Sequence, residues 1–386
     1  MTTRPYDIIL FGATGFTGRL VAARLAEKQS PEGFRFAIAG RSIEKLEQLR
    51  QQIGDMEMGC IRADSGDLQS LEAMTAQATI LINTAGPFNW YGESVVKACI
   101  TTGTHYLDIT GEPAFVHQVY SRYHQEAQQV GVCLVNCCGF DSIPADLATW
   151  LTARSLPRES PKTVRTFLRT NATFSGGTWT TAIHAIYRRT VHREERLSSG
   201  PRHPDTPRLD LKIHFSRLVD RWAIPMPVVD PHIVKRSARQ LPDDYGEAFA
   251  YGQFFTLSSF WKVVRLIVPI AAVFILVRFA ATRNWLFNRF RPGTGPSAET
   301  RSKSRFEVRA IGQAGKLQME TIVSGGDPGY DETAKMLTEA AFTMRDRLAA
   351  HRLISGVRTP VEALGMDLVD RLRKEGIRIE THPHGQ

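Results

Sequence analysis

Three glycines spaced three residues apart form the most distinctive chemical pattern of the chain. They lie directly after an apolar run and directly before an amphipathic one. Gly12 permits a tight turn, Gly15 lets backbone approach a pyrophosphate, and Gly18 lets a helix pack closely on a sheet. A pyrophosphate binds well at such a helix N-terminus, because the first backbone N–H groups of the helix are unpaired. The predicted pyrophosphate site comprises Gly12, Ala13, Thr14, Gly15, Phe16, Thr17 and Gly18.

The spacing of these glycines departs from the usual dinucleotide fingerprint. The chain has Gly-x-x-Gly-x-x-Gly where most dinucleotide-binding proteins have Gly-x-Gly-x-x-Gly. Alone, the motif is also compatible with a glycine-rich turn that binds nothing. The strand predicted before it and the helix predicted after it favour a dinucleotide.

A basic residue at the end of the second predicted strand indicates which dinucleotide binds. Residues 36–39 are apolar and are followed by Gly40, Arg41 and Ser42. An NAD site usually has an acid near this point, which accepts the ribose 2′-hydroxyl. Arg41 can instead pair with a 2′-phosphate and stack on adenine, and Ser42 can donate to the same phosphate. The alternative for Arg41 is a solvated charge at a strand end. We therefore predict NADP(H).

Two further loops are predicted to contact the cofactor, because ligands of doubly wound sheets lie beyond the carboxyl ends of the strands. Asp64 follows the third strand and would lie near the adenine amino group, although it could equally cap the next helix. The loop after the fourth strand would contact the ribose and nicotinamide. Its residues are Thr84, Ala85, Gly86 and Pro87.

The elements that must position these residues alternate regularly through residues 1–145. Strand-like runs separated by helical stretches predict an α/β fold with a Rossmann-type, doubly wound parallel sheet. The runs are 6–11, 36–39, 58–64, 79–84, 105–109 and 132–135.

The pattern changes in the second part of the chain. We predict that residues 146–330 form a second α/β domain with a mixed or antiparallel sheet. This domain is expected to bind the substrate. In it, 305–310 and 316–323 alternate in polarity and should pair antiparallel. A helix is expected over 179–191, and irregular connections over 195–256. Residues 331–386 predict a C-terminal helical region that packs back on the Rossmann domain.

Composition restricts the class of protein. A length of 386 residues favours two domains. Five cysteines, an odd number, without a secretory leader predict reduced thiols and a cytoplasmic protein. No motif typical of metalloproteases, NTPases or serine hydrolases occurs, and no metal site is predicted.

The net charge of +9 is concentrated in one region. Residues 259–305 contain nine basic residues and one acid, and within them 266–277 is apolar without a break. These twelve residues are fewer than the roughly 20 that span a bilayer. They predict peripheral contact of residues 259–291 with an anionic membrane surface. A buried core helix and a homodimer contact are the alternatives. An aliphatic run offers nothing that reads bases, so no nucleic-acid partner is predicted.

Short motifs spread from end to end of the chain resemble one known family. They resemble those of the saccharopine dehydrogenase-like oxidoreductases, in the branch that includes the trans-acting enoyl reductases of lipid biosynthesis. The resemblance implies a Rossmann domain, a second α/β domain, and NADP(H)-dependent reduction of a C=C bond in a lipid or polyketide acyl chain. The motifs are FGATGFTG (11–18), AGRS (39–42), NTAGPF (83–88), YGE (91–93), GTHYLD (103–108), GE (111–112), GFDSIP (139–144), SGGT (175–178), SGGDPGY (324–330) and GVRTP (356–360).

Enoyl reduction, if that is the reaction, needs a hydrogen-bond donor for the enolate and a proton for the α-carbon. Tyr106 could supply either, and His105, Asp108 and Glu112 could tune it. Asp141 and Ser142 form a second cluster before a helix N-terminus. Each candidate also has a structural explanation, since a strand tyrosine is usually core and an Asp-Ser pair is usually a cap. The predicted catalytic residues are Tyr106, Asp141 and Ser142.

Two other functions remain open. A saccharopine-type amino-acid dehydrogenase would need cationic anchors for several carboxylates, whereas the basic residues of this chain cluster beside the apolar run. A catalytically silent protein on a membrane or lipid droplet would keep the NADP(H) site without turnover.

Overall fold

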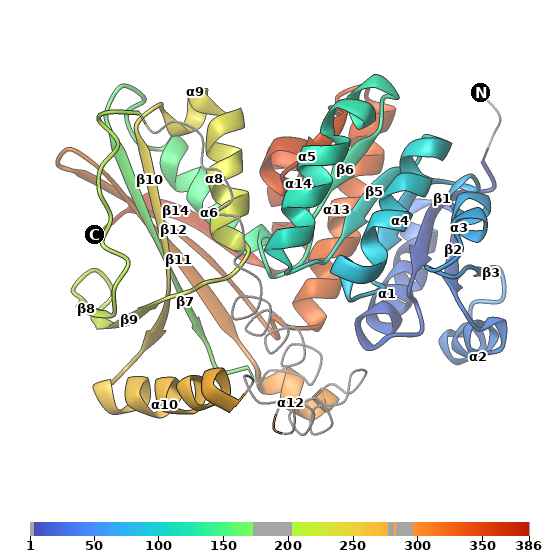
Figure 1. The fold of residues 1–386 in the computed structure, drawn as a ribbon, viewed down its shortest axis with the longest axis horizontal. Coiled ribbons are helices and arrows are strands. Elements are labelled where there is room, and N and C mark those ends of the chain that lie inside the picture. Colours follow the sequence, from blue (N-terminus) through green and yellow to red (C-terminus); the bar gives the residue numbers. More distant parts are fainter. Residues whose placement is uncertain (1–3, 173–202, 277–281, 283–295, 386) are drawn as a thin grey trace. The chain divides into compact units, whose positions relative to one another are not determined.

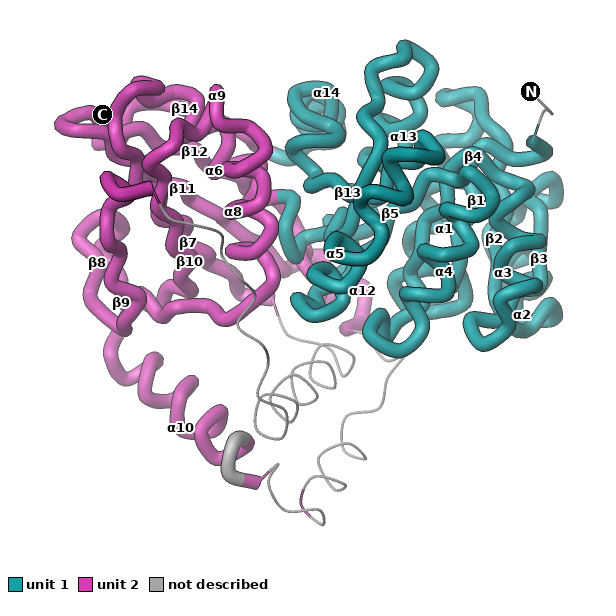
Figure 2. The backbone as a smooth tube through the Cα atoms, turned by 45° about the horizontal axis from the view of Figure 1, so that its top comes forward, with its two compact units in different colours: residues 1–143, 330–377 teal, residues 144–329, 378–386 magenta. Residues whose placement is uncertain are grey.

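The computed structural model describes residues 4–172, 203–276, 282 and 296–385. The chain forms two compact units, each of which is described here by itself (Figure 2). Unit 1 comprises Met1–Ile143 and Tyr330–Ile377, and unit 2 comprises Pro144–Gly329 and Arg378–Gln386. Each unit is therefore built from two separate stretches of the chain. The helix expected over 179–191 and the SGGT motif lie outside the described residues.

A parallel seven-stranded sheet forms the centre of unit 1 (Figure 1). Its order is β13-β6-β5-β4-β1-β2-β3, and all neighbouring strands are parallel. The chain order reverses between β1 and β4, which is where doubly wound sheets bind ligands. The predicted Rossmann-type sheet is thus confirmed. The strands are β1 (Tyr6–Phe11), β2 (Phe36–Gly40), β3 (Gly59–Arg62), β4 (Ala78–Asn83), β5 (His105–Asp108), β6 (Cys133–Val135) and β13 (Gly356–Arg358).

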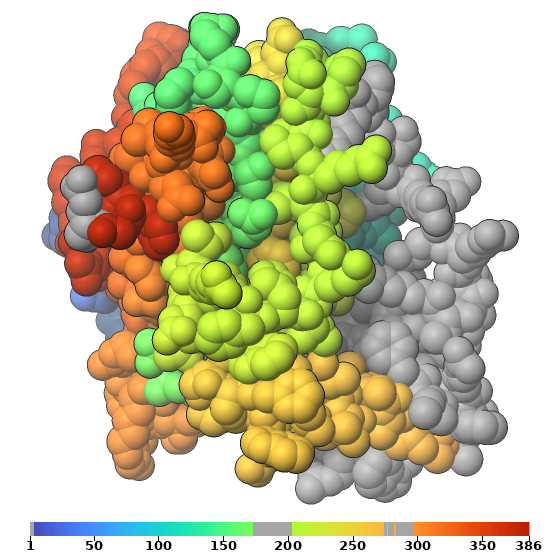
Figure 3. Space-filling view, turned by 90° about the vertical axis from the view of Figure 1, so that its left-hand side faces the viewer, coloured from blue at the N-terminus to red at the C-terminus, as the bar shows by residue number. Residues whose placement is uncertain are grey.

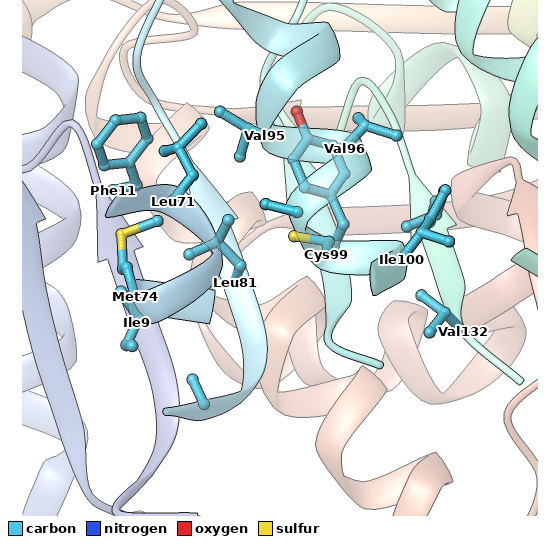
Figure 4. Packing of buried hydrophobic residues seen from close by; sticks show 14 of the residues in the cluster. Ile9, Phe11, Leu71, Met74, Leu81, Val95, Val96, Cys99, Ile100 and Val132 are labelled. Carbon is cyan, nitrogen blue, oxygen red and sulfur yellow. The ribbon is translucent and has the colours of Figure 1, made fainter. Parts of the chain in front are cut away.

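Helices cover both faces of this sheet. On one face, apolar side chains of two successive helices pack against Ile9 of β1 and Leu81 of β4 (Figure 4), and side chains of a third helix join the same buried cluster. These helices are α3 (Leu68–Thr75), α4 (Phe88–Thr102) and α5 (Pro113–Gln129). On the other face, α13 (Asp331–Ala349) contacts β4, β5 and α1 (Phe16–Glu32). Burial of large apolar side chains, at about 1.5–3 kcal/mol each, holds these layers together. Helix α2 (Ile43–Ile53) connects β2 to β3.

The C-terminal residues 331–386 contain two strands in addition to helices. Helices α13 and α14 (Pro360–Lys374) and strand β13 belong to unit 1, whereas β14 (Arg378–Pro383) pairs with β12 of unit 2. Ion pairs from Glu32 of α1 to Arg345 and Arg371, at 2.8 and 2.9 Å, attach the two helices. Besides the helices α13 and α14, the predicted helical region therefore contains the strands β13 and β14. The partners of β13 and β14 lie far away in the chain, so local sequence gives no sign of the pairing.

A mixed seven-stranded sheet forms the centre of unit 2. Its order is β14-β12-β11-β7-β10-β9-β8, in which only β7 and β10 run parallel. The predicted antiparallel pair is confirmed as β11 and β12. The remaining strands and helices are β7 (Lys162–Thr170), β8 (His214–Ser216), β9 (Arg221–Pro225), β10 (Phe249–Leu257), β11 (Phe306–Ala314), β12 (Leu317–Gly325), α6 (Ile143–Arg154), α8 (Asp230–Gln240), α9 (Pro242–Tyr245) and α12 (Ala298–Lys303).

Strands and helices of unit 2 follow one another from β8 to β10, so the prediction of irregular connections was wrong for residues 214–256, whereas residues 203–213 form no helix or strand. Helix α8 begins at an Asp-Pro pair and buries Ile233, Val234 and Ser237, while charges cover its other side. Strand β10 lies between β7 and β9 and is buried on both faces. It therefore lacks the alternation that marks a half-exposed strand.

The apolar segment near residue 270 forms the helix α10 (Phe260–Leu276). It touches β9 and β10 near its start, and several of its large apolar side chains are exposed. Trp261 is 78% and Val268 61% exposed. These exposures contradict the alternative of a buried core helix. Among the described helices, none combines the length and apolar character needed to cross a membrane.

Candidate cofactor and active site

The glycine turn of unit 1 has no room for side chains. Gly12 ends β1 with φ of +84°, and a Cβ there would lie 2.7 Å from the backbone N of Ala85. A Cβ on Gly18 would overlap the carbonyl oxygen of Gly12. Gly15 is the N-cap of α1, and no side chain caps that helix. The turn is therefore a bare backbone cradle at a helix N-terminus, as pyrophosphate binding requires.

The loop after β4 lies directly beside this cradle. The backbone N–H and the Oγ1 hydroxyl of Thr84 both donate to the carbonyl oxygen of Phe11, at 2.9 Å each. Ala85 donates its N–H to Oδ1 of Asn83 at 2.9 Å. The structure thus brings the predicted residues after β1 together with Thr84 and Ala85 at the sheet reversal, while Gly86 and Pro87 continue the loop to α4.

Two arginines stand at the carboxyl ends of β2 and β3. Arg41 is exposed and makes no hydrogen bond or ion pair with any described residue. Arg62 lies within the predicted run 58–64. It is in register with Gly40 on the neighbouring strand and is also exposed. Two cations on adjacent strand ends suit a 2′-phosphate better than a ribose hydroxyl.

Ser42 and Asp64 have local structural roles. The Ser42 hydroxyl accepts from the N–H of Lys45 at 3.3 Å and donates to the carboxylate of Glu44 at 2.6 Å. Its proton is therefore already hydrogen-bonded to a residue of α2. That hydrogen bond lowers the pKa of the Glu44 carboxyl. Asp64 accepts from the N–H of Gly66, while Asp67 caps α3. Asp64 is therefore not the helix cap, and its exposed carboxylate remains at the predicted adenine side.

A buried polar network joins the ends of β4, β5 and β6. The Tyr106 hydroxyl accepts from Nδ2 of Asn83 at 3.1 Å and donates to Oδ2 of Asp108 at 2.9 Å. Asn136 donates to the same Asp108 oxygen at 2.7 Å. All four side chains are buried. Tyr106 is therefore closed off from a substrate in this arrangement, where it acts as a positioning residue in the core, and its catalytic role stays a prediction.

Asp108 also shapes the loop after β6. Its Oδ1 accepts from the N–H groups of Thr110 and Cys137, at 3.0 and 2.9 Å. Cys137 has φ of +62°, a conformation that costs a non-glycine residue of order 1–3 kcal/mol. The carboxylate thus holds a strained turn at the carboxyl end of the sheet.

Burial controls the protonation of this network. Desolvation raises the pKa of Asp108 from 3.8 to about 6, despite the hydrogen bonds that it accepts. Desolvation likewise raises the pKa of Tyr106 well above 10.0. His105 accepts from the N–H of Cys133 at 3.0 Å, and burial lowers its pKa to about 4. His105 is therefore neutral at physiological pH and serves as a structural acceptor.

Glu112 caps the helix that follows the cofactor loop. Its two carboxylate oxygens accept from the N–H groups of Phe88 and Asn89, at 2.9 and 3.0 Å. Its own N–H donates to Thr110, which in turn donates to Asp108. Helix α4 begins at Phe88, where Glu112 satisfies its first N–H groups.

The second predicted catalytic cluster is divided by exposure. Ser142 is fully buried, and its hydroxyl donates to the carbonyl oxygen of Asp141. Asp141 is exposed as a residue, but its carboxylate lies against Gly111, where a Cβ would come within 2.9 Å of Oδ2, and desolvation raises the pKa of that carboxyl from 3.8 to about 6. Of the three predicted catalytic residues, Asp141 alone is exposed.

Comparison with known proteins identifies the family. The saccharopine dehydrogenase NADP binding domain matches residues 8–135, from β1 to β6. The chain is 32% identical to the saccharopine dehydrogenase-like oxidoreductase of Rattus norvegicus, over 97% of each protein. It belongs to this family. The oxidoreductase is also 31% identical to the trans-acting enoyl reductase of Mycobacterium leprae, over 98% of each. Apo saccharopine dehydrogenase (L-Glu forming) from Saccharomyces cerevisiae shares the fold, with a TM-score of 0.59 and 14% identity over 98% of this chain and 99% of that one.

The oxidoreductase binds NADP(H), and its own geometry fits that cofactor. The bare turn at 12–18 can hold the pyrophosphate, and Arg41 with Arg62 can hold the 2′-phosphate. The loop from Thr84 to Pro87 is placed for the ribose and nicotinamide half. The predicted cofactor class is confirmed, whereas the individual contacts stay predictions.

Sequence reasoning missed several members of this site. Arg62 could have been found from the parallel register of β2 and β3, because it ends its strand as Arg41 follows the neighbouring one. The roles of Asn83 and Asn136 could not be predicted from the sequence. They depend on the spatial neighbours Tyr106 and Asp108, which the sequence does not reveal. Tyr91, 40% exposed on the first turn of α4, was passed over as part of a motif.

Proposed function

We propose that this NADP-binding oxidoreductase reduces an activated C=C bond of a lipid-like acyl chain. One observation carries the proposal. The loops that follow β4, β5 and β6 contain no lysine or arginine, and Trp90 and Tyr91 expose 54% and 40% of their surface there. An amino-dicarboxylate needs cationic partners, whereas an acyl chain needs apolar surface. The full-length likeness to a trans-acting enoyl reductase supports the same reaction class.

The chain's own task in such a reaction is to deliver a proton. NADPH, when bound, would supply the hydride that the β-carbon takes up as the π bond breaks. The α-carbon then takes a proton from an accessible acid, and Tyr106 and Ser142 are too deeply buried to provide it. We assign this proton to the hydroxyl of Tyr91, which lies on the first turn of α4, after the loop from Thr84 to Pro87. Solvent can reprotonate it, because the ring is exposed. Asp141 is the second exposed acid.

The test follows NADPH oxidation by the purified protein with a trans-enoyl thioester. Saccharopine with NADP⁺ is offered in parallel. Turnover of the thioester is expected, and Tyr91→Phe should lower kcat by roughly a hundredfold or more without changing the Kd of NADPH. Tyr120→Phe removes a phenol from α5 and is the control. Turnover of saccharopine with an inert thioester would replace this proposal by an amino-acid dehydrogenase.

We also propose that α10 brings the oxidoreductase to an anionic membrane surface. Phe260, Trp261 and Val268 expose apolar area, and Lys262 and Arg265 lie on the same helix. Each basic residue near an anionic surface contributes about 1 kcal/mol. Trp261→Ser combined with Val268→Asp should abolish sedimentation with anionic liposomes, whereas Phe215→Ser, at an exposed aromatic of β8, should not. Unchanged sedimentation of the double variant would exclude α10.

A further inference from the structure

Unit 2 contains a pocket of about 460 Å³ that has no part in the cofactor site. Its walls come from residues 203–211, from α8 and α9, and from the start of β10, all within unit 2. Figure 3 shows the segment that follows residue 203, in yellow-green, on the surface of this unit. The volume lies within the range of small-molecule sites, which is about 300–1,000 Å³. We refer to it as the α8 pocket.

The lining of the α8 pocket combines apolar and cationic groups. Leu209, Leu211 and Phe249 supply apolar surface. Lys235 and Arg239 are both exposed residues of α8 and both line the pocket. The mixture is that of a site for an amphiphile, in which a few charged groups fix one end of a largely apolar ligand.

The positions of the two cations indicate the sign of that charged end. Lys235 and Arg239 are four residues apart, so they are neighbours on one side of α8. Two cations on one wall of a pocket favour an anionic end of a ligand over a cationic one. Arg239 makes no hydrogen bond or ion pair with any residue in the described parts of the chain. Its five N–H donors are therefore available to a carboxylate or phosphate.

Two further polar side chains of the pocket, His203 and Glu247, lie close to each other. Nε2 of His203 lies 3.7 Å from a carboxylate oxygen of Glu247, and both residues line the pocket. Glu247 is the one acid among the described lining residues, against Lys235 and Arg239, so cationic side chains outnumber acidic ones there.

We propose that the α8 pocket binds an amphiphilic anion, with its carboxylate or phosphate headgroup on Lys235 and Arg239 and its alkyl chain over Leu209, Leu211 and Phe249. The site requires neither NADP(H) nor turnover. It therefore stands independently of the proposed reaction, and either can fail without the other.

The experiment measures binding to the full-length protein by calorimetry, with each ligand below its critical micelle concentration. Decanoate and decyl phosphate are the two anionic probes, and decyltrimethylammonium is the cationic one. Both anions are expected to bind in preference to the cation, and the tighter of the two identifies the headgroup. Arg239→Ala should weaken the anions roughly fivefold or more, and Leu211→Asp should weaken them further by repulsion. Leu211 is exposed, so this change leaves the core intact.

Two controls make the result specific. Arg208→Ala removes an exposed cation from the same segment that does not line the pocket, and it should bind the anions as wild type does. The Kd of NADPH should be the same in all three variants. Binding of the cation as tight as that of the anions, unchanged binding in Arg239→Ala, or absence of binding to wild type would each overturn the proposal.

Discussion

The hydroxyl of Tyr106 donates a 2.9 Å hydrogen bond to Oδ2 of Asp108, and both side chains are fully buried at the end of β5. This pair gives a tyrosine near the predicted nicotinamide side a structural role in the core. The hydroxyl oxygen of Tyr106 accepts a hydrogen bond from Asn83, and its proton is donated to Asp108. The same aspartate holds the backbone of Cys137 in its unusual conformation. The tyrosine therefore acts on the site through the loops that the carboxylate positions.

Tyr106→Phe should consequently reduce stability more than it reduces chemistry. The substitution leaves Nδ2 of Asn83 buried without its acceptor, which costs about 1–3 kcal/mol. Urea unfolding measures this loss, and kcat of the folded fraction should remain within a few-fold of wild type. A loss of kcat by a hundredfold in a fully folded variant would restore Tyr106 as a catalytic residue.

The pKa of Asp108 predicts a specific pH dependence of stability. Desolvation raises that pKa from 3.8 to about 6 in the folded protein. Because the folded pKa is the higher one, the contribution of Asp108 to stability is complete below about pH 4 and declines as the pH rises through 6. Two pKa units correspond to roughly 2–3 kcal/mol.

Comparison of wild type with Asp108→Asn isolates this contribution, because the other titrating groups cancel in the difference. The variant is itself destabilised, since an amide cannot accept four hydrogen bonds as the carboxylate does. The difference between their free energies of unfolding should shrink as the pH is raised from 4 to 7. A difference that is constant over this range would show that the carboxyl titrates normally.

Glu112→Gln tests the cap of the helix beside the cofactor loop. An amide offers one acceptor oxygen, so either Phe88 or Asn89 loses the partner of its N–H. We expect a loss of about 1 kcal/mol in unfolding free energy. The Kd of NADPH should also rise, because α4 begins directly after the loop from Thr84 to Pro87. Glu126→Gln, at an exposed position of α5, is the matched control and should change neither quantity.

The first half of the fold could be predicted because its signals are local. Each buried parallel strand is a short apolar run, and Gly12 and Gly18 are glycines for reasons that their own turn supplies. The second unit was harder. Strand β10 is buried on both faces, and β14 joins a sheet whose other strands lie far away in the chain. Such pairing depends on tertiary structure, and the hydrophobic periodicity of the sequence gives no indication of it.

The limits at the site have the same origin. Arg41 was identifiable because a charge follows a strand end where an acid is usual, but its neighbour Arg62 became apparent only from the register of β2 and β3. The burial of Tyr106 could not be foreseen, because the sequence places it on a strand near the site but does not show which way it faces. Exposure separates Asp141 from Ser142, although the two are adjacent in the chain.

Gly18→Ala should disable the cofactor cradle. Its Cβ would overlap the carbonyl oxygen of Gly12 and lie 2.9 Å from Cα of Ala13, and neither backbone atom can move away freely. We expect NADPH binding to weaken at least tenfold, together with a loss of stability of about 1–3 kcal/mol. Gly329→Ala meets no atom within 4 Å and should be neutral. Full NADPH affinity in Gly18→Ala would mean that the pyrophosphate lies elsewhere.

Arg41→Ala and Arg62→Ala together test the site of the 2′-phosphate. Each charge-assisted hydrogen bond to a phosphate is worth about 1.5–3 kcal/mol, so each substitution should raise the Kd of NADPH by roughly ten- to a hundredfold. NADH lacks the phosphate, and its Kd should change by less than about twofold. Lys97→Ala removes an exposed cation from α4 in the same unit and controls for net charge. Fluorescence titration of both cofactors gives the ratio directly. An equal loss for NADPH and NADH would place the two arginines on the adenine or the pyrophosphate instead. An effect of Arg41→Ala alone would leave Arg62 as a solvated strand end.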